Sequence, residues 1–247
     1  MSSFIRRDLA IIPLDSDTRM IIACDSCGAI GKKSGDMFNL SPHFAAKFTV
    51  RVALTEVLCS GANPVAITNG VSCEMHPTGE ETIQGIREEI KNADIENISL
   101  IGSTEENFTT TMTALSITAI GLAKESELKF KPASMGDKLI LFGTPQVGNE
   151  VDLESTGYYP EIRKLLHLNE VKEIVPVGSK GVAYEANTLA ALNNLDFNPY
   201  EAKIDMQKSA GPATCLLILC ANSSVNQVIN IHPKSTVIGE LYTNYSR

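Results

Sequence analysis

Acidic residues occur in this chain where strands end and loops begin, which is where sites are usually built. Asp8 precedes the first apolar run, Asp25 ends the second, and Glu105 follows a third. Glu56 lies within a largely apolar segment, where a carboxylate costs free energy unless a cation or a hydrogen-bond donor satisfies it. Mg²⁺ prefers oxygen ligands and commonly bridges one or two carboxylates to phosphate oxygens. The four acids therefore suggest a magnesium site, although each of them singly could be a helix cap or a solvated group.

Apolar periodicity predicts the elements that hold these acids. Two short apolar runs on either side of a polar turn at 15–17 predict a β-hairpin or two sequential strands. Apolar residues at helical spacing further along predict a helix that Gly61 ends. The predicted strands of this first half are 9–14, 20–24, 64–71, 98–101 and 113–122, and the predicted helices are 42–60 and 78–94.

A charged stretch at 124–138, which contains Pro132 and Gly136, is the best candidate for a linker. A second set of alternating elements follows it. Its predicted strands are 138–142, 214–220 and 236–241, and its predicted helices are 160–168 and 182–195. We therefore expect an α+β protein of two domains, residues 1–125 and residues 126–247.

Composition excludes several classes of protein. The 247 residues are 43% hydrophobic and 20% charged, which is typical of a soluble globular protein. The formal net charge of −8 provides no basic field for binding nucleic acid. The strongly apolar run 215–221 is shorter than the ~20 residues of a membrane-spanning helix, and the amino-terminal residues lack the apolar core of a signal peptide. We expect a cytoplasmic protein that binds neither nucleic acid nor membrane, with its six cysteines reduced.

Short motifs follow one another along almost the whole chain. They are RDLAII at 7–12, IIACDSCG at 21–28, LTEVLCSGANP at 54–64, LIGSTE at 100–105, GDKLI at 136–140, SAGP at 209–212 and TVIGE at 236–240. No single motif is specific. In order and spacing, however, they resemble the superfamily of aminoimidazole-ribonucleotide synthase, thiamine-monophosphate kinase, selenophosphate synthetase and a hydrogenase-maturation factor.

The resemblance implies a PurM-like fold in which the N-terminal sheet domain binds ATP and Mg²⁺ and pairs with a second copy as a homodimer. The smaller C-terminal α/β domain would close over the phosphates and the substrate. Asp8, Asp25, Glu56 and Glu105 are the implied metal ligands. The residues expected to contact the nucleotide are Gly28, Lys32, Gly102, Ser103, Thr104 and Lys180.

Two departures from the family pattern affect the site. Thr104 stands where the family carries an acid, so we expect Glu105 to take over as the metal ligand. The kinase-like members carry an Asp before glycines in the second domain, whereas this chain has VGSKG at 177–181. Lys180 there could contact a phosphate, or the segment could be an ordinary loop that enters a helix. The catalytic base is not identified; Glu106, Asp152 and Glu154 are open alternatives.

The predicted activity is phosphoryl transfer from Mg-ATP to a small molecule. CDSCGAIGKK at 24–33 and GTPQVGNEV at 143–151 resemble a branch assigned as α-ribazole kinase of cobalamin salvage. Two alternatives stay open: an ATP-dependent synthetase, and a nucleotide-binding regulatory protein without catalysis. Cys24 and Cys27 have CxxC spacing, but no second pair completes a zinc site, so we expect small buried thiols.

Overall fold

The computed structural model describes residues 2–243, and these fold into two units. Unit 1 contains residues 2–58, 62–126 and 153–157, whereas unit 2 contains residues 59–61, 127–152 and 158–243. The main division falls between Ser126 and Glu127, within the stretch that composition suggested as a linker. Both units combine helices with strands, so the expected α+β class is confirmed.

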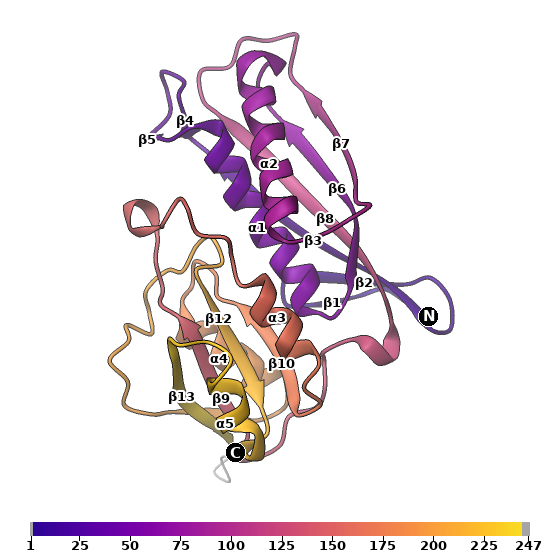
Figure 1. Cartoon of the computed structure of the whole chain (residues 1–247), viewed down its shortest axis with the longest axis vertical. Coiled ribbons are helices and arrows are strands. Elements are labelled where there is room, and N and C mark those ends of the chain that lie inside the picture. The colour runs from indigo at the N-terminus through magenta and orange to yellow at the C-terminus, as the bar shows by residue number, and fades with distance from the viewer. Residues whose placement is uncertain (1, 244–247) are drawn as a thin grey trace. The chain divides into compact units, whose positions relative to one another are not determined.

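Unit 1 is built on a six-stranded sheet with the strand order β1-β2-β3-β8-β6-β7 (Figure 1). Neighbouring strands are antiparallel, except that β6 and β7 are parallel. The polar turn between β2 and β3 forms the hairpin that the sequence predicts. The strands are β1 (Phe4–Arg6), β2 (Leu9–Pro13), β3 (Thr18–Gly28), β6 (Asn63–Val71), β7 (Ser99–Thr104) and β8 (Ala114–Lys124).

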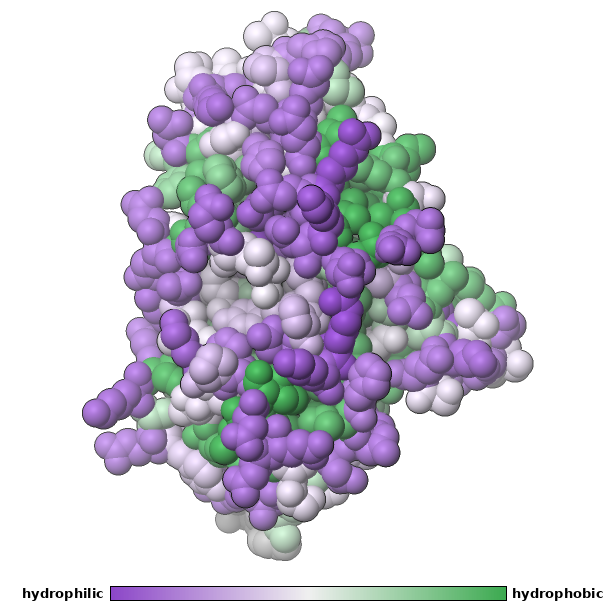
Figure 2. Space-filling model, in the orientation of Figure 1, coloured by the Kyte–Doolittle hydropathy of each residue, from purple (hydrophilic) through white to green (hydrophobic). Residues whose placement is uncertain are grey.

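Two helices, α1 (Pro42–Cys59) and α2 (Glu80–Asn92), lie across one face of this sheet (Figure 1). The alternate residues of β3 and β8 that face them, such as Ile21 and Ile117, are fully buried. The two helices approach closely at Gly85, where an added Cβ would lie 2.0 Å from the His43 carbonyl oxygen. Figure 2 shows a largely hydrophilic surface over α2, as is expected where a helix turns its polar face to solvent.

The opposite face of the sheet carries the other set of alternating residues, and no helix of unit 1 within the described residues covers it. Ile5 is 80% exposed and Ile101 is 68% exposed. Between them lie half-buried apolar side chains from the central strands. These are Ala10, Ile12, Met20, Ile22, Ala66, Ile120 and Leu122.

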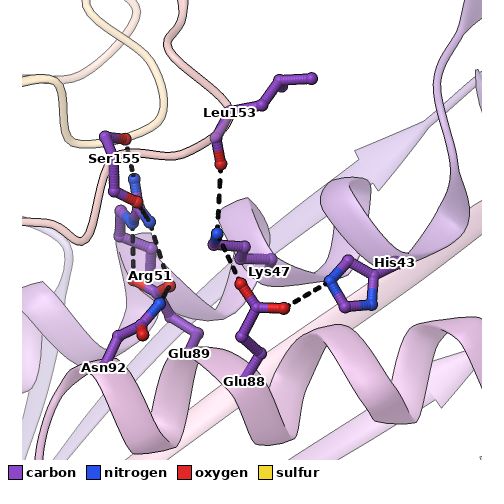
Figure 3. Close-up of polar contacts among 8 residues, drawn as sticks. All are labelled: His43, Lys47, Arg51, Glu88, Glu89, Asn92, Leu153 and Ser155. Atoms are coloured by element: carbon purple, nitrogen blue, oxygen red, sulfur yellow. Dashed lines mark hydrogen bonds and ion pairs between the residues drawn. The ribbon is translucent and has the colours of Figure 1, made fainter.

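Charged side chains form a buried layer between α1 and α2 (Figure 3). The Arg51 guanidinium donates from Nε to Glu89 Oε1 at 2.6 Å and from Nη2 to Glu89 Oε2 at 3.0 Å. Lys47 Nζ lies 2.7 Å from Glu88 Oε1. The same two cations bind residues 153–157, because Lys47 donates to the Leu153 carbonyl and Arg51 donates to Ser155. These hydrogen bonds explain why this short segment belongs to unit 1.

Unit 2 contains an antiparallel five-stranded sheet with the order β10-β12-β9-β13-β11. Figure 1 shows α3 and α5 on one face and α4 on the other. All six residues of β12 are buried, as its apolar run predicts. The elements are β9 (Lys138–Gly143), α3 (Tyr159–Leu166), β10 (Val171–Pro176), α4 (Val182–Leu192), β11 (Asp196–Pro199), β12 (Cys215–Cys220), α5 (Val225–Ile229) and β13 (Ser235–Tyr242).

Short elements complete the chain. A two-residue parallel pair, β4 (Ile30–Gly31) and β5 (Phe38–Asn39), lies in the segment that leads into α1. Single turns of helix are η1 (Met75–Gly79), η2 (Glu125–Glu127), η3 (Gly148–Glu150) and η4 (Asn222–Ser224). Among residues 2–243, no helix is both long enough and apolar enough to cross a membrane.

Candidate functional site

A hollow of about 590 Å³ lies in unit 1, where β3, β6 and β7 end and β8 begins. The sheet register brings these ends together, because Gly28 pairs with Ala114, and Gly70 pairs with both Ser116 and Ser103. We call it the strand-end hollow. It is lined by Ser26, Cys27, Gly28, Gly70, Val71, Ser72, Ser103, Thr104, Glu105, Ala114, Leu115 and Ser116.

Small residues keep the strand-end hollow open. A Cβ added at Gly28 or at Gly70 would meet no atom within 4 Å, so both glycines face empty space. Five lining residues carry a hydroxyl group, Glu105 carries the one carboxylate, and none of the described lining residues is basic or aromatic. Such a lining offers hydrogen bonds to an uncharged polar ligand. It provides no direct counter-charge for a polyphosphate.

The residues expected to contact a nucleotide divide into two groups. Gly28, Ser103 and Thr104 line the strand-end hollow. Gly102 packs against Asn69, because a Cβ added at Gly102 would lie 2.1 Å from Asn69 Oδ1. Gly102 also borders a second hollow of about 180 Å³. Lys32 Nζ lies 3.3 Å from Glu81. The structure therefore gathers three of these residues at one place, with Gly102 beside them.

Lys180 belongs to unit 2, in the loop that leads into α4. Its Nζ donates to the Tyr184 hydroxyl at 3.1 Å and lies 4.3 Å from the centre of the Tyr184 ring. The side chain thus has a local partner on its own helix. A phosphate contact by Lys180 stays a prediction.

Asp25 differs from the other predicted metal ligands. It lies on β3 two residues before Cys27, which lines the strand-end hollow, so the two side chains are on the same face of the strand. Burial raises the pKa of the Asp25 carboxyl, and a backbone hydrogen bond from Ser26 offsets this in part. Among residues 2–243, no ion pair involves Asp25. A half-buried carboxylate without an internal counter-charge can bind a cation that comes from solution.

Glu56 has a partner inside the chain. It is buried in α1, and its Oε2 lies 3.4 Å from Nη1 of Arg7, whose side chain is also buried. The expectation that this carboxylate needs a partner is therefore confirmed, but the partner in the structure is an arginine. Asp8 follows Arg7 in the exposed turn between β1 and β2. Because Leu9 pairs with Ala23, this turn lies beside the part of β3 that contains Asp25.

Glu105 follows β7, which is the edge strand of the sheet. β7 is three strand positions from β3, or about 14 Å at the usual strand spacing of ~4.8 Å. Glu105 Oε1 accepts hydrogen bonds from the backbone N–H of Asn107 at 2.7 Å and of Phe108 at 3.2 Å. Within residues 2–243, no three His, Cys, Asp or Glu side chains are placed to hold a metal ion. The joint role of the four carboxylates therefore stays a prediction.

Glu106, an open alternative for the catalytic base, also has a local structural role. It accepts hydrogen bonds from the Thr104 hydroxyl at 2.7 Å and from the Met75 N–H at 2.9 Å, and these lower the pKa of its carboxyl. A carboxylate whose pKa is lowered is a weaker base. The two remaining alternatives, Asp152 and Glu154, lie in different units.

Cys24 and Cys27 lie on opposite faces of β3, because side chains alternate along a strand. Cys24 is exposed and lies 3.5 Å from the Ser116 hydroxyl, so the expectation of a buried thiol is wrong for this residue. Burial raises the pKa of Cys27 to about 11, which leaves it an unreactive thiol. All six cysteines are free, as expected, and this pair cannot hold one metal ion between its sulfurs.

Several lining residues were not singled out by the sequence. They are Ser26, Gly70, Ser72 and Ser116. The available signal was small polar residues and glycine at the ends of predicted strands, which is a common pattern by itself. Only the pairing of four strands that are distant in sequence shows that these residues meet.

Most of unit 1 matches a known protein family. Residues 6–123 match the family described as AIR synthase related protein, N-terminal domain. This range contains both long helices and almost the whole six-stranded sheet. Unit 1 is thus similar to the N-terminal domain of AIR synthase related proteins. The resemblance drawn from the motifs is thereby confirmed at the level of the superfamily.

Solved structures share the fold over both units, so the expected PurM-like fold is confirmed. PurL from Thermotoga maritima, complexed with ATP, matches 95% of this chain with a TM-score of 0.72 and 16% identity. HypE from E. coli matches 90% with a TM-score of 0.67 and 15% identity. This chain spans 42% of the PurL chain and 80% of the HypE chain. No curated protein matches it in sequence.

Proposed function

We propose that this protein is a Mg-ATP-dependent small-molecule kinase whose nucleotide site includes the strand-end hollow and Asp25. One observation carries the proposal. Asp25 is a half-buried carboxylate that has no ion pair within the described chain, and it shares one face of β3 with Cys27, two residues further on, which lines the hollow. A bound cation would relieve this cost, and a nucleotide would bring the cation with it. PurL, which has a similar fold, is complexed with ATP in its structure.

The donors near β3 fit Mg²⁺ in kind, because they are carboxylate oxygens. Asp25 would bind the ion, with Asp8 from the neighbouring turn as a second donor. Glu56 is a weaker candidate since Arg7 already balances its charge. Mg²⁺ supplies neutralisation of the phosphate charge, which the lining of the hollow lacks. The protein's own contribution is to position the acceptor and to hold the uncharged part of the ligand with hydroxyl groups.

The specific substrate that we propose is α-ribazole, phosphorylated on its ribose 5′-hydroxyl. The motifs at 24–33 and 143–151 support this choice. A second candidate is an ATP-dependent synthetase. It is favoured by the fold shared with phosphoribosylformylglycinamidine synthase II from Thermotoga maritima, whose name is that of a synthase. The third candidate, nucleotide binding without catalysis, is favoured by Thr104 at the position of the family acid.

We further propose that the exposed face of the unit 1 sheet pairs with a second copy. Its apolar residues continue across six strands, and an apolar sheet face normally packs against another layer. Replacing Ile5, which is 80% exposed, by Lys should convert a dimer to a monomer in sedimentation velocity. Leu192→Lys, at an exposed position of unit 2, is the matched control and should leave the dimer intact.

Product analysis tests the activity. The protein is incubated with ATP, Mg²⁺ and α-ribazole, and the products are identified by mass. We expect ADP together with α-ribazole phosphate. ADP without a phosphorylated acceptor would favour the synthetase, and nucleotide binding without turnover would favour the regulatory protein. Absence of nucleotide binding would overturn all three.

Filling the hollow tests the site. Gly70→Val should reduce nucleotide affinity at least about 10-fold, because its side chain would enter empty space within the hollow and cost little stability. Gly211→Val is the control, since that glycine also faces open space but lies in unit 2. Equal nucleotide affinity of the two variants would show that the nucleotide does not bind in the strand-end hollow.

A further inference from the structure

The loop at 105–113 begins at the wall of the strand-end hollow. It connects β7 to β8, and the residues at its two junctions, Glu105 and Ala114, both line the hollow. The loop nevertheless exposes large apolar side chains, since Phe108 is 77% exposed and Met112 is 49% exposed. An exposed apolar side chain beside a binding hollow differs from one scattered on the general surface, because a ligand can cover it.

Hydrogen bonds fix this loop in place. The Glu105 carboxylate binds the N–H groups of Asn107 and Phe108, and the Glu105 N–H donates to the Cys73 carbonyl at 2.9 Å. At the other end, the Thr113 N–H and hydroxyl donate to the Asp36 carboxylate at 2.7 and 2.8 Å. Phe108 is therefore held exposed on a restrained turn. Its position costs no further ordering of the backbone when a ligand binds.

The hollow itself has no partner for a flat ring. Its described lining contains hydroxyl-bearing residues, glycines, apolar residues and the Glu105 carboxylate, but no aromatic side chain and no cation. A planar heteroaromatic ring that entered it would find hydrogen bonds along its edge and no stacking surface. Phe108 is the aromatic residue on the loop that borders the hollow.

We propose that Phe108 covers the ring of a heteroaromatic nucleoside bound in the strand-end hollow, with Met112 extending the apolar contact. The inference rests on the proposed nucleotide site and adds the chemical class of the group that the hollow receives. Aromatic stacking and sulfur–aromatic contact supply the affinity. The hydroxyl-bearing residues bind the sugar, and the phosphates lie outside the lining because it contains no cation. The nucleoside could belong to ATP or to a nucleoside substrate, since both carry such a ring.

A single-tryptophan variant tests this contact, because the chain contains no Trp. Phe108→Trp places one fluorophore on the loop, and Tyr242→Trp, at an exposed position of unit 2, is the control. Both full-length proteins are titrated with adenosine, α-ribazole, Mg-ATP and tripolyphosphate, and binding to wild type is measured in parallel by calorimetry. We expect the indole emission of the Phe108→Trp variant to change with at least one ring-bearing ligand and not with tripolyphosphate. The emission of the Tyr242→Trp control should stay constant.

Loss of the ring at position 108 should weaken binding of the same ligand. Phe108→Ala should lower affinity about 3- to 10-fold, and Phe108→Tyr should restore it. Calorimetric binding without an emission change in the Phe108→Trp variant, and with unchanged affinity of Phe108→Ala, would overturn the inference while leaving the nucleotide site intact. No binding of any ligand to wild type would overturn the proposed function instead. Emission of the Phe108→Trp variant that depends on protein concentration alone would assign Phe108 to an interface between copies.

Discussion

The buried layer between α1 and α2 and the end of β3 differ in how they balance negative charge. Between the helices, the Glu89 carboxylate is fully buried and the Arg51 guanidinium binds both of its oxygens. At the end of β3, the Asp25 carboxylate is half-buried, and no cation of the described chain pairs with it. Glu56 belongs with the first region because Arg7 is its partner.

The difference separates structural acids from candidate ligand-binding acids. A buried carboxylate that is paired with an arginine is neutralised before any ligand arrives. A carboxylate whose pKa is raised by burial keeps an unmet demand for positive charge. Asp25 meets the second description beside a hollow, whereas Glu56 and Glu89 meet the first.

Breaking the charged layer should have the largest effect on stability. Arg51→Met leaves the Glu89 carboxylate buried without its counter-ion and removes the contacts to Ser155, so we expect a loss of about 3–5 kcal/mol in the free energy of unfolding. Urea denaturation followed by circular dichroism measures it. The double variant with Glu89→Met should recover most of this loss. A loss in Arg51→Met no larger than that in Lys208→Met, which breaks an exposed pair with Glu150, would contradict the distinction.

An intermediate case is Glu74, which pairs with Lys33 at the surface. Burial opposes ionisation of Glu74, but hydrogen bonds from Lys33 and Thr78 outweigh it and lower the pKa to about 2. Because the folded pKa is depressed, the stabilisation is complete above the ordinary value of 4.5 and is lost as the pH falls toward 2. Lys33→Met should therefore cost at most about 1 kcal/mol at pH 7. The difference from wild type should shrink between pH 4.5 and pH 2; a constant difference would show that the pair contributes through packing alone.

Asp25→Asn should have the smallest effect on stability, and it should increase the stability, whereas Arg51→Met and Lys33→Met should decrease it. The folded pKa of Asp25 is raised, so ionisation of this group lowers stability as the pH rises above the ordinary value of 3.8. The Asn variant cannot ionise. In the absence of Mg²⁺, the unfolding midpoint of Asp25→Asn minus that of wild type should therefore increase as the pH rises above 3.8. The difference should level off once the pH exceeds the raised folded pKa of Asp25. A midpoint below that of wild type at neutral pH would mean that the Asp25 carboxylate has a stabilising partner.

Local pattern predicted the elements that carry strong apolar periodicity. The run 215–221 became the fully buried β12, and Gly61, with a φ of +90°, ends α1 as expected. Other strands were not predicted because their residues do not favour strands alone. The strand β10 contains Lys172 and Glu173, and β11 reads Asp-Phe-Asn-Pro; both form because β12 and β13 offer them hydrogen-bonding edges. Pairing between distant segments decided these elements.

The same limit applies to the site. Asp25 could be singled out because it ends a predicted strand, and the chemistry of a buried carboxylate showed that Glu56 needs a partner. That the partner is Arg7, 49 residues earlier, follows from how α1 crosses the sheet. Glu105 satisfies the N–H groups of its own loop, a local use that the acidic pattern did not reveal. The hollow depends on strand register, which the sequence leaves open.

Mg-ATP binding by folded Asp25→Asn, measured by calorimetry against wild type, tests most directly whether Asp25 serves a ligand. We expect the affinity for ATP with Mg²⁺ to fall at least about 10-fold, because a neutral amide cannot balance the ion. In EDTA the two proteins should bind ATP equally weakly. Equal affinity of both proteins for ATP in the presence of Mg²⁺ would contradict the assignment of Asp25 to the nucleotide site.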